Sequence, residues 1–503
     1  MTSPAVVISR GVTEDSGHGR LGAAQLFSIV AILALAFALR CLFLNKQSLW
    51  VDEFFTIYWS RFDPGFLLGP GARLETNPPT YYLLMHTWTR LFGTSELSVR
   101  FPSVLASAAT VWVVYALSRK LFDHRTAVLA ALFAALEPAA VYYAQEARSY
   151  ALLAFTDALA LYALAGYADD VVVRGVRQWP WVALFVSAAV GAIFVHYASV
   201  VFVAACFATI CLYLISTRPF PVRELWLWCA AGLATVVCSS PVLVLASGVA
   251  ASPGISWISS PSRWAIEDFL TEQLSVSVPP RSTATLLLGA PLVAIFCSAL
   301  FRFRLNRVQL GLLVLLPAIF CDIVVGVSFS RPLLLPRTAV WLTTPLCVLL
   351  ARAATVQPTA WRRAAVVATA LAVFIGALAQ YFWSYHKEDW RTAAHLAAAE
   401  PQCSGPIIFV QEYGAGLTYY QPRLASRPLI LLKTEWDLRT PAYALASRLP
   451  HTEILPVSEL GSFLKDHPYS VLALRGPRRP LLDSLGPPRL RAELGGGVTV
   501  SCF

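Results

Sequence analysis

The sequence predicts a polytopic all-α membrane domain of about 11–13 transmembrane helices, followed by a small C-terminal α/β extracytoplasmic domain. Three observations predict this fold class. The 503-residue chain is 57% hydrophobic and only 14% charged, whereas soluble proteins carry roughly 25% charged residues. Arginine-rich loops alternate with arginine-poor loops, as the positive-inside rule requires. The last section has a different composition, with short apolar runs that are typical of buried strands.

Residues 1–21 form a polar segment, which we expect to be a cytoplasmic tail. The apolar run over 21–44 is too long for a signal-peptide core and lacks a small-residue cleavage site, so it is interpreted as a retained first span. The net charge of +10 is attributed to cytoplasmic loops and contact with anionic lipids. No nucleic-acid partner is therefore expected.

Further apolar stretches approach the ~20 residues that cross roughly 30 Å of hydrocarbon. They lie near 101–120, 125–143, 148–168, 180–195, 198–216, 225–248, 283–301, 308–328, 333–351 and 363–383. The arginine-rich loops between them contain Arg119 and Arg125, Arg174 and Arg177, Arg218 and Arg223, Arg302 to Arg307, and Arg352 to Arg363. A transmembrane domain over 22–385 follows, with its N-terminus in the cytoplasm and everything after Tyr385 outside.

Two long external loops are expected, over 45–100 and 249–282. The first contains "NPPTYYLLMHTWTRLFG", in which Pro-Pro marks a helix start and Tyr82, His86 and Arg90 recur every four residues opposite apolar side chains. This pattern predicts an amphipathic helix over 78–93 on the outer membrane surface. A short re-entrant segment or a twelfth span is the alternative.

Residues 386–503 are expected to form the extracytoplasmic α/β domain, because "GPIIFV", "PLILL" and "YSVLAL" resemble strands of a parallel-leaning sheet, with helix-like stretches such as "AYALASRL" between them. Cys403 and Cys502 bracket this region. They would form a disulfide if the region faces an oxidising compartment.

Polar residues collect at the expected outer ends of the spans. "SLWVDEFFTIYWS" places Asp52 and Glu53 after the first span, and other members of this set are Glu137, Gln145, Glu146, Arg148, His196, Tyr197, Arg331, Arg337 and the "HKEDWR" segment at 386–391. Carboxylates, histidine, tyrosine and arginine on one membrane face predict a functional site there.

Each of these residues also has a purely structural interpretation. Asp52 and Glu53 would cap a helix within an interfacial aromatic belt, Glu146 and Arg148 would form a local ion pair, and Arg337 would extend to the headgroups. Asp157 is the hardest to explain, because it lies near mid-membrane and needs a partner or a polar cavity. The sequence has no HExxH metal motif, P-loop, GxSxG elbow or dinucleotide fingerprint.

The segments "LWVDEFFT", "NPPTYYLLMHTWTRLFGTSELSVRFPSVL", "QEARSYALLAF", the "HY" hairpin and "KEDWRTAAHLA" occur in this order. Together they resemble the bacterial family 39 glycosyltransferases, which are related to protein O-mannosyltransferases and to the aminoarabinose transferase of lipid A. The resemblance covers roughly residues 22 to 400 and implies the GT-C fold. It also implies a polyprenyl-phosphate-linked sugar as donor, used on the non-cytoplasmic side of the bacterial inner membrane.

The resemblance implies an inverting transfer with Asp52 as the catalytic base. Glu53 and Glu146 are the other expected catalytic carboxylates. The expected substrate-binding residues are Asn77, Tyr82, His86, Tyr143, Gln145, Arg148, Tyr150, His196, Tyr197, Arg331 and Arg337. Relatives of the aminoarabinose-transferase type often have Lys-Pro where this chain has Asn77-Pro78, so an arginine must replace that phosphate contact. The segment 257–270 is expected to cover the site as a lid.

The sequence leaves several points open. A divalent cation, Mg²⁺ or Mn²⁺, is one of them, and Asp52 and Glu146 are its expected ligands if it binds. The acceptor is an envelope glycan, a lipid or a protein. The alternative functions are a polysaccharide polymerase or ligase with a polyprenyl-pyrophosphate donor, a lipid or solute transporter, and a non-catalytic scaffold. The odd number of spans, the absence of an inverted repeat and the large external domain argue against the transporter.

Overall fold

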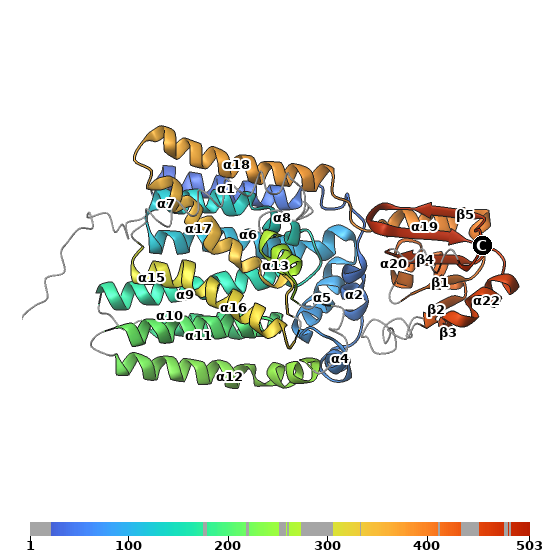
Figure 1. Cartoon of the computed structure of the whole chain (residues 1–503), viewed down its shortest axis with the longest axis horizontal. Coiled ribbons are helices and arrows are strands. Elements are labelled where there is room, and N and C mark those ends of the chain that lie inside the picture. Colours follow the sequence, from blue (N-terminus) through green and yellow to red (C-terminus); the bar gives the residue numbers. More distant parts are fainter. Residues whose placement is uncertain are drawn as a thin grey trace, which may run out of the picture.

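The structure is a computed structural model. It describes residues 22–174, 179–217, 221–250, 258, 261–272, 305–331, 333–410, 413–433, 452–476, 481 and 484–503. A bundle of long helices forms one part of the molecule and a sheet domain forms the other, with a layer of short helices between them (Figure 1).

Long apolar helices make up the bundle, as the sequence predicts. Those with the length and composition of a membrane span are α1 (Ala23–Cys41), α6 (Glu96–Leu121), α9 (Tyr150–Arg174), α11 (Ser199–Ser216), α12 (Val222–Ala250), the continuous run α15 (Arg307–Leu310), η2 (Gly311–Leu315) and α16 (Leu316–Ser328), and α18 (Ala360–Trp383). Two shorter apolar helices, α10 (Trp179–Val195) and α17 (Thr343–Thr355), lie at two more of the expected spans. The expected span over 283–301 lies outside the described residues.

The span expected over 125–143 is bent rather than straight. Helix α7 (His124–Leu136) ends before Pro138, and α8 (Pro138–Ala144) leaves at 53° to it. Glu137 accepts hydrogen bonds from the amides of Ala139 and Ala140 and thereby caps α8. The buried guanidinium of Arg40 donates to the carbonyl oxygens of Ala134 and Ala135, which the bend leaves without helical partners.

Four short helices cover the end of the bundle nearest the sheet domain. They are α2 (Val51–Trp59), α3 (Pro64–Leu68), α4 (Pro70–Leu74) and α5 (Pro79–Phe92). Tyr82 and His86 of α5 are buried, whereas Leu84, Leu91 and Phe92 are 40%, 70% and 58% exposed. Tyr82 and His86 therefore lie on the buried face of α5, whereas Thr87 and Arg90 are exposed. The expected position of this helix on the outer membrane surface stays a prediction.

The described residues of the sheet domain contain six strands in the order β3-β2-β1-β4-β6-β5. The strands are β1 (Ile407–Phe409), β2 (Leu429–Lys433), β3 (Thr452–Pro456), β4 (Val471–Arg475), β5 (Leu490–Glu493) and β6 (Val498–Cys502). β3, β2, β1 and β4 are parallel, as the apolar runs predict, and β6 and β5 add an antiparallel edge. In the described part of this domain, the α-helices are α19 (Trp390–Ala399), α20 (Tyr413–Tyr420) and α22 (Leu460–Asp466). The helix-like stretch at 442–449 lies outside the described residues.

Cys403 and Cys502 form a disulfide with their Cα atoms 5.2 Å apart, which ties the segment after α19 to the end of β6. The domain also packs closely on α2. A Cβ added to Gly416 of α20 would lie 2.8 Å from the ring of Phe54, and Tyr58 Oη is 3.0 Å from Thr418 Oγ1. Phe54 belongs to the same hydrophobic core as β1, β2 and β4. The position of α2 therefore depends on the sheet domain.

Candidate active site

The first turn of α2 holds the two adjacent carboxylates. Its leading amide, that of Val51, donates to the carboxylate of Glu388 at 3.2 Å, and the Trp50 amide donates to Glu53 at 3.2 Å. Carboxylates are favoured at a helix N-terminus because amides there lack helical acceptors. Successive helical residues point about 100° apart, so Asp52 and Glu53 face different surroundings.

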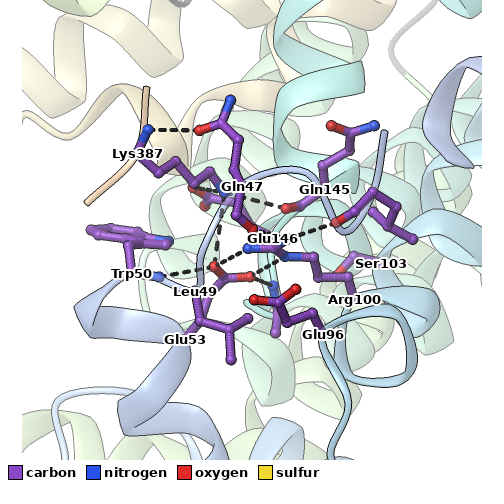
Figure 2. Close-up of polar contacts among 12 residues, drawn as sticks. Gln47, Leu49, Trp50, Glu53, Glu96, Arg100, Ser103, Gln145, Glu146 and Lys387 are labelled. Atoms are coloured by element: carbon purple, nitrogen blue, oxygen red, sulfur yellow. Dashed lines mark hydrogen bonds and ion pairs between the residues drawn. The ribbon is translucent and has the colours of Figure 1, made fainter. Parts of the chain in front are cut away.

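Glu53 is fully buried and bonded to Arg100 through both of its oxygens. Arg100 Nε and Nη2 each lie 2.8 Å from a Glu53 carboxylate oxygen, and the Ala147 amide donates at 2.9 Å (Figure 2). Arg100 also donates to the carbonyl oxygens of Leu44, Gln47 and Ser48. Burial alone would raise the pKa of Glu53, but the positive charges of Arg100 and Lys387 and these hydrogen bonds lower it to about 2. The pair holds the loop before α2 against α6.

Lys387 brings a second buried charge to this network (Figure 2). Its Nζ lies 3.3 Å from Glu146 Oε1, 3.9 Å from Glu53 Oε2 and 3.2 Å from the carbonyl oxygen of Gln145. Burial raises the pKa of Glu146 above its usual value, and the charge of Lys387 counteracts part of that rise. One ammonium thus lies between two carboxylates.

Asp52 is on the open side of α2. Its side chain is 25% exposed, and Oδ2 accepts a hydrogen bond from Arg337 Nη1 at 3.1 Å. Arg148 Nη1 donates to the Asp52 carbonyl oxygen at 3.4 Å and to Thr56 Oγ1 at 3.3 Å. The guanidinium carbons of Arg148 and Arg337 lie 5.8 and 5.5 Å from the ring centroid of Tyr150. Two guanidinium groups therefore lie beside Asp52 and the ring of Tyr150, and each can donate hydrogen bonds to an anion.

Aromatic side chains surround this group. Tyr150 contacts Tyr143 and His196, with ring centroids 5.5 and 6.0 Å away. Burial, then the charges of Arg337 and Arg148, lowers the pKa of His196 to about 3, so its ring is neutral at physiological pH. His196 Nδ1 accepts from the amide of Ala198, which assigns the ring proton to Nε2. Tyr143 Oη donates to Glu272 at 3.0 Å, just after α13 (Arg263–Thr271), which is part of the expected lid.

The segment between α4 and α5 contributes a further carboxylate, Glu75. Its Oε1 accepts from the amide and the side chain of Asn77 at 3.1 and 2.9 Å, and from Tyr82 Oη at 3.1 Å. Glu75 is 2% exposed. Burial raises its pKa, and the bonds to Asn77 and the nearby charge of Arg148 partly offset that rise.

The structure brings most of the expected site residues together, but not all of them. Gln145 is occupied by Tyr381 and by the carbonyl oxygens of Arg40 and Leu42. His86 Nδ1 lies 2.9 Å from the carbonyl oxygen of Ser60 at the end of α2, away from Asp52. Arg331 is exposed after α16. We therefore do not include these three residues in the site.

Asp157, in α9, is 1% exposed, and neither of its carboxylate oxygens has a hydrogen-bond partner within the part of the chain that the structure describes.

Sequence reasoning missed Glu75, Glu272 and Lys387 as site residues. Glu75 stands two residues before Asn77-Pro78, and Lys387 is part of the "KEDWR" segment, so both had a local signal. Glu272 had none, because only the fold brings it to Tyr143.

The residues present do not suit a divalent cation held by Asp52 and Glu146. The Lys387 ammonium is already 3.3 Å from Glu146, and Arg337 is 3.1 Å from Asp52. Across the described ranges, no three His, Cys, Asp or Glu side chains are grouped as metal ligands. The reaction is therefore described through the protein's own side chains.

Comparison with known proteins agrees with the fold. Residues 76–245 match the family described as dolichyl-phosphate-mannose-protein mannosyltransferase. Crystal structures of ArnT from Cupriavidus metallidurans, in the apo state and bound to undecaprenyl phosphate, are similar over 95% of this chain and 98% of theirs, with a TM-score of 0.62 and 15% identity.

The oligosaccharyltransferase AglB from Archaeoglobus fulgidus, in complex with an inhibitory peptide and a dolichol-phosphate, is similar over 79% of this chain and 63% of its own, with a TM-score of 0.53 and 13% identity. No curated protein sequence matches the chain.

Proposed function

We propose that this chain is a family 39-like GT-C protein and an inverting glycosyltransferase of the cytoplasmic membrane, because residues 76–245 match the mannosyltransferase family model and the fold resembles that of ArnT. It moves a sugar from a polyprenyl-phosphate donor to a hydroxyl group of an acceptor at the outer face. One observation carries this proposal: the partly exposed carboxylate of Asp52 accepts a hydrogen bond from Arg337, and Arg148 donates to the backbone carbonyl oxygen of the same residue. That group combines a candidate base with two neighbouring positive charges.

Asp52 is the proposed base. An acceptor hydroxyl is a weak nucleophile until its proton is removed, and a positioned carboxylate contributes typically ~10²–10⁴-fold to the rate. The acceptor oxygen forms a bond to the anomeric carbon as the bond to the phosphate oxygen breaks. Its proton passes to Asp52, and attack from the opposite face inverts the anomeric centre.

Arg337 and Arg148 are the proposed phosphate ligands. The leaving polyprenyl phosphate gains negative charge in the transition state, so fixed cations stabilise it more than the ground state. Arginine also suits the phosphate group, because its planar fork donates two parallel hydrogen bonds. ArnT bound to undecaprenyl phosphate and AglB bound to a dolichol-phosphate support a donor of this class. The two arginines would also supply the charge that a lysine at position 77 provides in relatives.

Glu53, Glu146 and Lys387 are proposed to position the site rather than to exchange protons with substrate. Glu53 is fully buried and bonded to Arg100. Glu146 is 1% exposed and lies against Lys387. These contacts fix the start of α2, and thereby the direction of Asp52.

An outer-face site is proposed from the arginine distribution together with the disulfide. Cys403 and Cys502 are bonded in the domain that packs on α2. Disulfides persist in oxidising compartments and are rare in the cytosol. The acceptor is proposed to be an envelope lipid, glycan or protein, since these hydroxyls are available on that side.

The test is mass spectrometry of envelope glycoconjugates from a deletion strain, complemented with the native chain or with Asp52→Asn at equal membrane levels. The expected result is a species that loses one sugar on deletion and regains it only with the native chain. Loss of a whole oligosaccharide would instead favour a polymerase or ligase. Full complementation by Asp52→Asn would exclude Asp52 as the base.

A further inference from the structure

The helix that holds Asp52 has no capping side chain at its N-cap position. That position is occupied by Trp50, whose indole has no acceptor atom and makes no capping hydrogen bond. The first amide of the helix, that of Val51, nevertheless has a partner, because it donates to the Glu388 carboxylate at 3.2 Å. Glu388 lies 337 residues later in the chain, just before α19, and is 5% exposed. The cap of α2 therefore comes from the segment that begins the sheet domain.

Glu388 is itself held by side chains of the sheet domain. Its Oε1 lies 2.6 Å from Arg475 Nε, at the end of β4. Its Oε2 accepts from Trp390 Nε1, in α19, at 2.7 Å, in addition to the amide of Val51. Because both carboxylate oxygens are bonded within the sheet domain, the capping oxygen is fixed relative to the sheet and does not simply follow α2.

A glycine turn fixes the backbone at this carboxylate. Gly496, between β5 and β6, has a φ of +65°, and a Cβ built on it would lie 2.5 Å from the Cα atom of Glu388. Only glycine adopts this conformation readily and allows so close an approach. The Asp389 amide also donates to the carbonyl oxygen of Gly495 at 3.0 Å. The turn between β5 and β6 thus determines where Glu388 stands.

The residues that lead into α2 have a second partner in the sheet domain. The Leu49 amide donates to Tyr420 Oη, at the end of α20, at 2.7 Å. Tyr420 Oη donates in turn to Glu96, in the first turn of α6. The amides of Leu49 and Val51 therefore both end on side chains of the sheet domain, so the backbone that enters α2 is held from that domain at two points.

This attachment bears directly on the candidate base. Val51 immediately precedes Asp52, so their Cα atoms are about 3.8 Å apart. Arg337, which donates to Asp52 at 3.1 Å, belongs instead to the bundle and lies between α16 and α17. The Asp52–Arg337 pair thus forms only if the sheet domain holds α2 at the right place on the bundle. A displacement of about 1 Å at a reacting group can lower a rate ~10²-fold.

We propose that Glu388 is a positioning residue for Asp52, and that it acts by holding the first turn of α2 through the Val51 amide. This proposal rests on the proposed function, because it assigns Glu388 an effect on the transfer step. The reach of the side chain and its acceptor oxygen matter more than its charge, which Arg475 already matches. Glu388 takes no part in the proton transfer itself.

Three substitutions of Glu388 separate reach from charge. Glu388→Gln keeps the length and an acceptor oxygen, and Arg475, whose side chain is 40% exposed, can turn its donors to water. Glu388→Asp keeps the charge but is one methylene shorter, and Glu388→Ala removes the carboxylate. The control is Asp63→Ala, because Asp63 caps α3, the next helix in the chain, by accepting from the Phe66 amide at 3.0 Å.

Three measurements are made on each full-length variant. Hydrogen–deuterium exchange in lipid nanodiscs reports on the amides of α2, and binding of polyprenyl phosphate reports on the two arginines. The rate at which the deletion strain regains the missing sugar, at low and equal membrane levels, reports on transfer.

Glu388→Asp and Glu388→Ala should exchange the α2 amides faster than the native chain, because the first turn loses its cap. They should restore the sugar roughly 10- to 100-fold more slowly. Their binding of polyprenyl phosphate should be unchanged, since Arg148 and Arg337 remain. Glu388→Gln and Asp63→Ala should match the native chain in α2 exchange, binding and transfer.

The outcomes separate this inference from the proposed function. If the native chain restores no sugar, the proposed function fails and the positioning role fails with it. If Glu388→Asp and Glu388→Ala restore the sugar as fast as the native chain, the proposed function stands and the positioning role is wrong.

Two further results would overturn the positioning role alone. Transfer by Glu388→Asp but not by Glu388→Gln would mean that charge matters rather than reach. Loss of polyprenyl phosphate binding in the slow variants would mean general damage to the site. If Glu388→Ala fails to fold, the comparison of Glu388→Asp with Glu388→Gln decides, because each changes the side chain by a single group.

Discussion

Asp52 and Glu53 are neighbours in the chain, but their carboxylates lie in opposite surroundings. Asp52 is 25% exposed at the side chain and has one ion pair with Arg337 at 3.1 Å. Glu53 is fully buried and has two 2.8 Å bonds to Arg100. One helical residue step separates a carboxylate that solvent can reach from one that the scaffold encloses. The acidic pair therefore has two distinct roles in the proposed mechanism.

Asp52→Asn is expected to lower the rate of sugar transfer by ~10²–10⁴-fold, because the amide cannot take the acceptor's proton. Binding of polyprenyl phosphate should change little, since the two arginines remain. The measurement is transfer by purified protein under single-turnover conditions. The control is Asp123→Asn, which alters another aspartate–arginine pair. The Asp123 carboxylate lies 3.4 Å from Arg352 and caps α7. Equal rates for native protein and Asp52→Asn would contradict the base assignment.

Glu53→Gln is expected to destabilise the protein by ~3–5 kcal/mol, because it leaves the buried Arg100 without its charged partner. The effect should be visible as a lower denaturation temperature in detergent. The exposed pair Arg263–Glu267, with side chains 82% and 39% exposed, supplies the comparison. Glu267→Gln should change stability by less than ~1 kcal/mol, since exposed pairs contribute little. Similar stability losses for the two variants would show that Arg100 finds other compensation.

The stability difference between native protein and Glu53→Gln should depend on pH in one direction. The pKa of Glu53 is lowered to about 2 in the folded state by Arg100 and Lys387 against burial, from roughly 4.3 when unfolded. A carboxyl group whose pKa is lowered by folding contributes its full stabilisation at pH values above its pKa in the unfolded chain. That stabilisation is lost as the pH falls through its pKa in the folded protein. The difference in denaturation temperature should be constant above about pH 5 and shrink towards about pH 2. A difference that widens with acid would mean that Glu53 is protonated in the native protein.

Much of the fold could be predicted because lipid imposes a simple pattern. Spans are long apolar runs, so the apolar stretches and the charges of the loops between them predicted most helices of the bundle. The bend at Glu137 could not be predicted with the same ease. It depends on a hydrogen bond from Arg40 to the carbonyl oxygen of Ala134, ninety-four residues later in the chain. That oxygen has no helical donor because Pro138 lacks an amide hydrogen. The apolar runs predicted only β1, β2 and β4; β3 and β5 are short and partly exposed, and β6 alternates only weakly.

The candidate site likewise has features that the sequence predicts and features that depend on the fold. Asp52, Arg148 and Arg337 could be singled out as candidates because charged groups at the ends of apolar spans are costly and therefore informative. The burial of Glu53 could not be found, since it depends on Arg100, forty-seven residues later, reaching across to α2. Gln145 and His86 were expected to bind substrate, but the fold uses their polar atoms for backbone contacts. The sequence indicates where polar groups collect, whereas packing decides which of them remain available.

Lys387 and Glu146 should be energetically coupled, and the coupling should extend to catalysis. Lys387→Met leaves Glu146 and Glu53 with less positive charge, and Glu146→Gln leaves the buried ammonium with less negative charge. The double variant is expected to lose less stability than the sum of the losses in the two single variants. A double-mutant cycle on denaturation temperature and on transfer rate measures this, with an expected interaction of ~0.5–3 kcal/mol. Additive effects would show that the 3.3 Å contact does not couple the two residues.

The disulfide should stabilise the sheet domain and, through it, the active site. Cys403 and Cys502 are separated by 99 residues, and closing a loop of that size restricts the unfolded chain by up to ~4–5 kcal/mol in the entropic description. Replacing both cysteines with serine should therefore lower the denaturation temperature. It should also lower the transfer rate, because α20 packs Gly416 against Phe54 of the helix that holds Asp52.

The free and exposed Cys211 provides the control, since Cys211→Ser removes a thiol but no crosslink. Thiol labelling of membranes before and after reduction should reveal two new reactive cysteines in the native chain and none in the double-serine variant. Labelling of both cysteines without reduction would show that the bond does not form in cells. It would also remove one of the two arguments for placing the sheet domain outside the membrane.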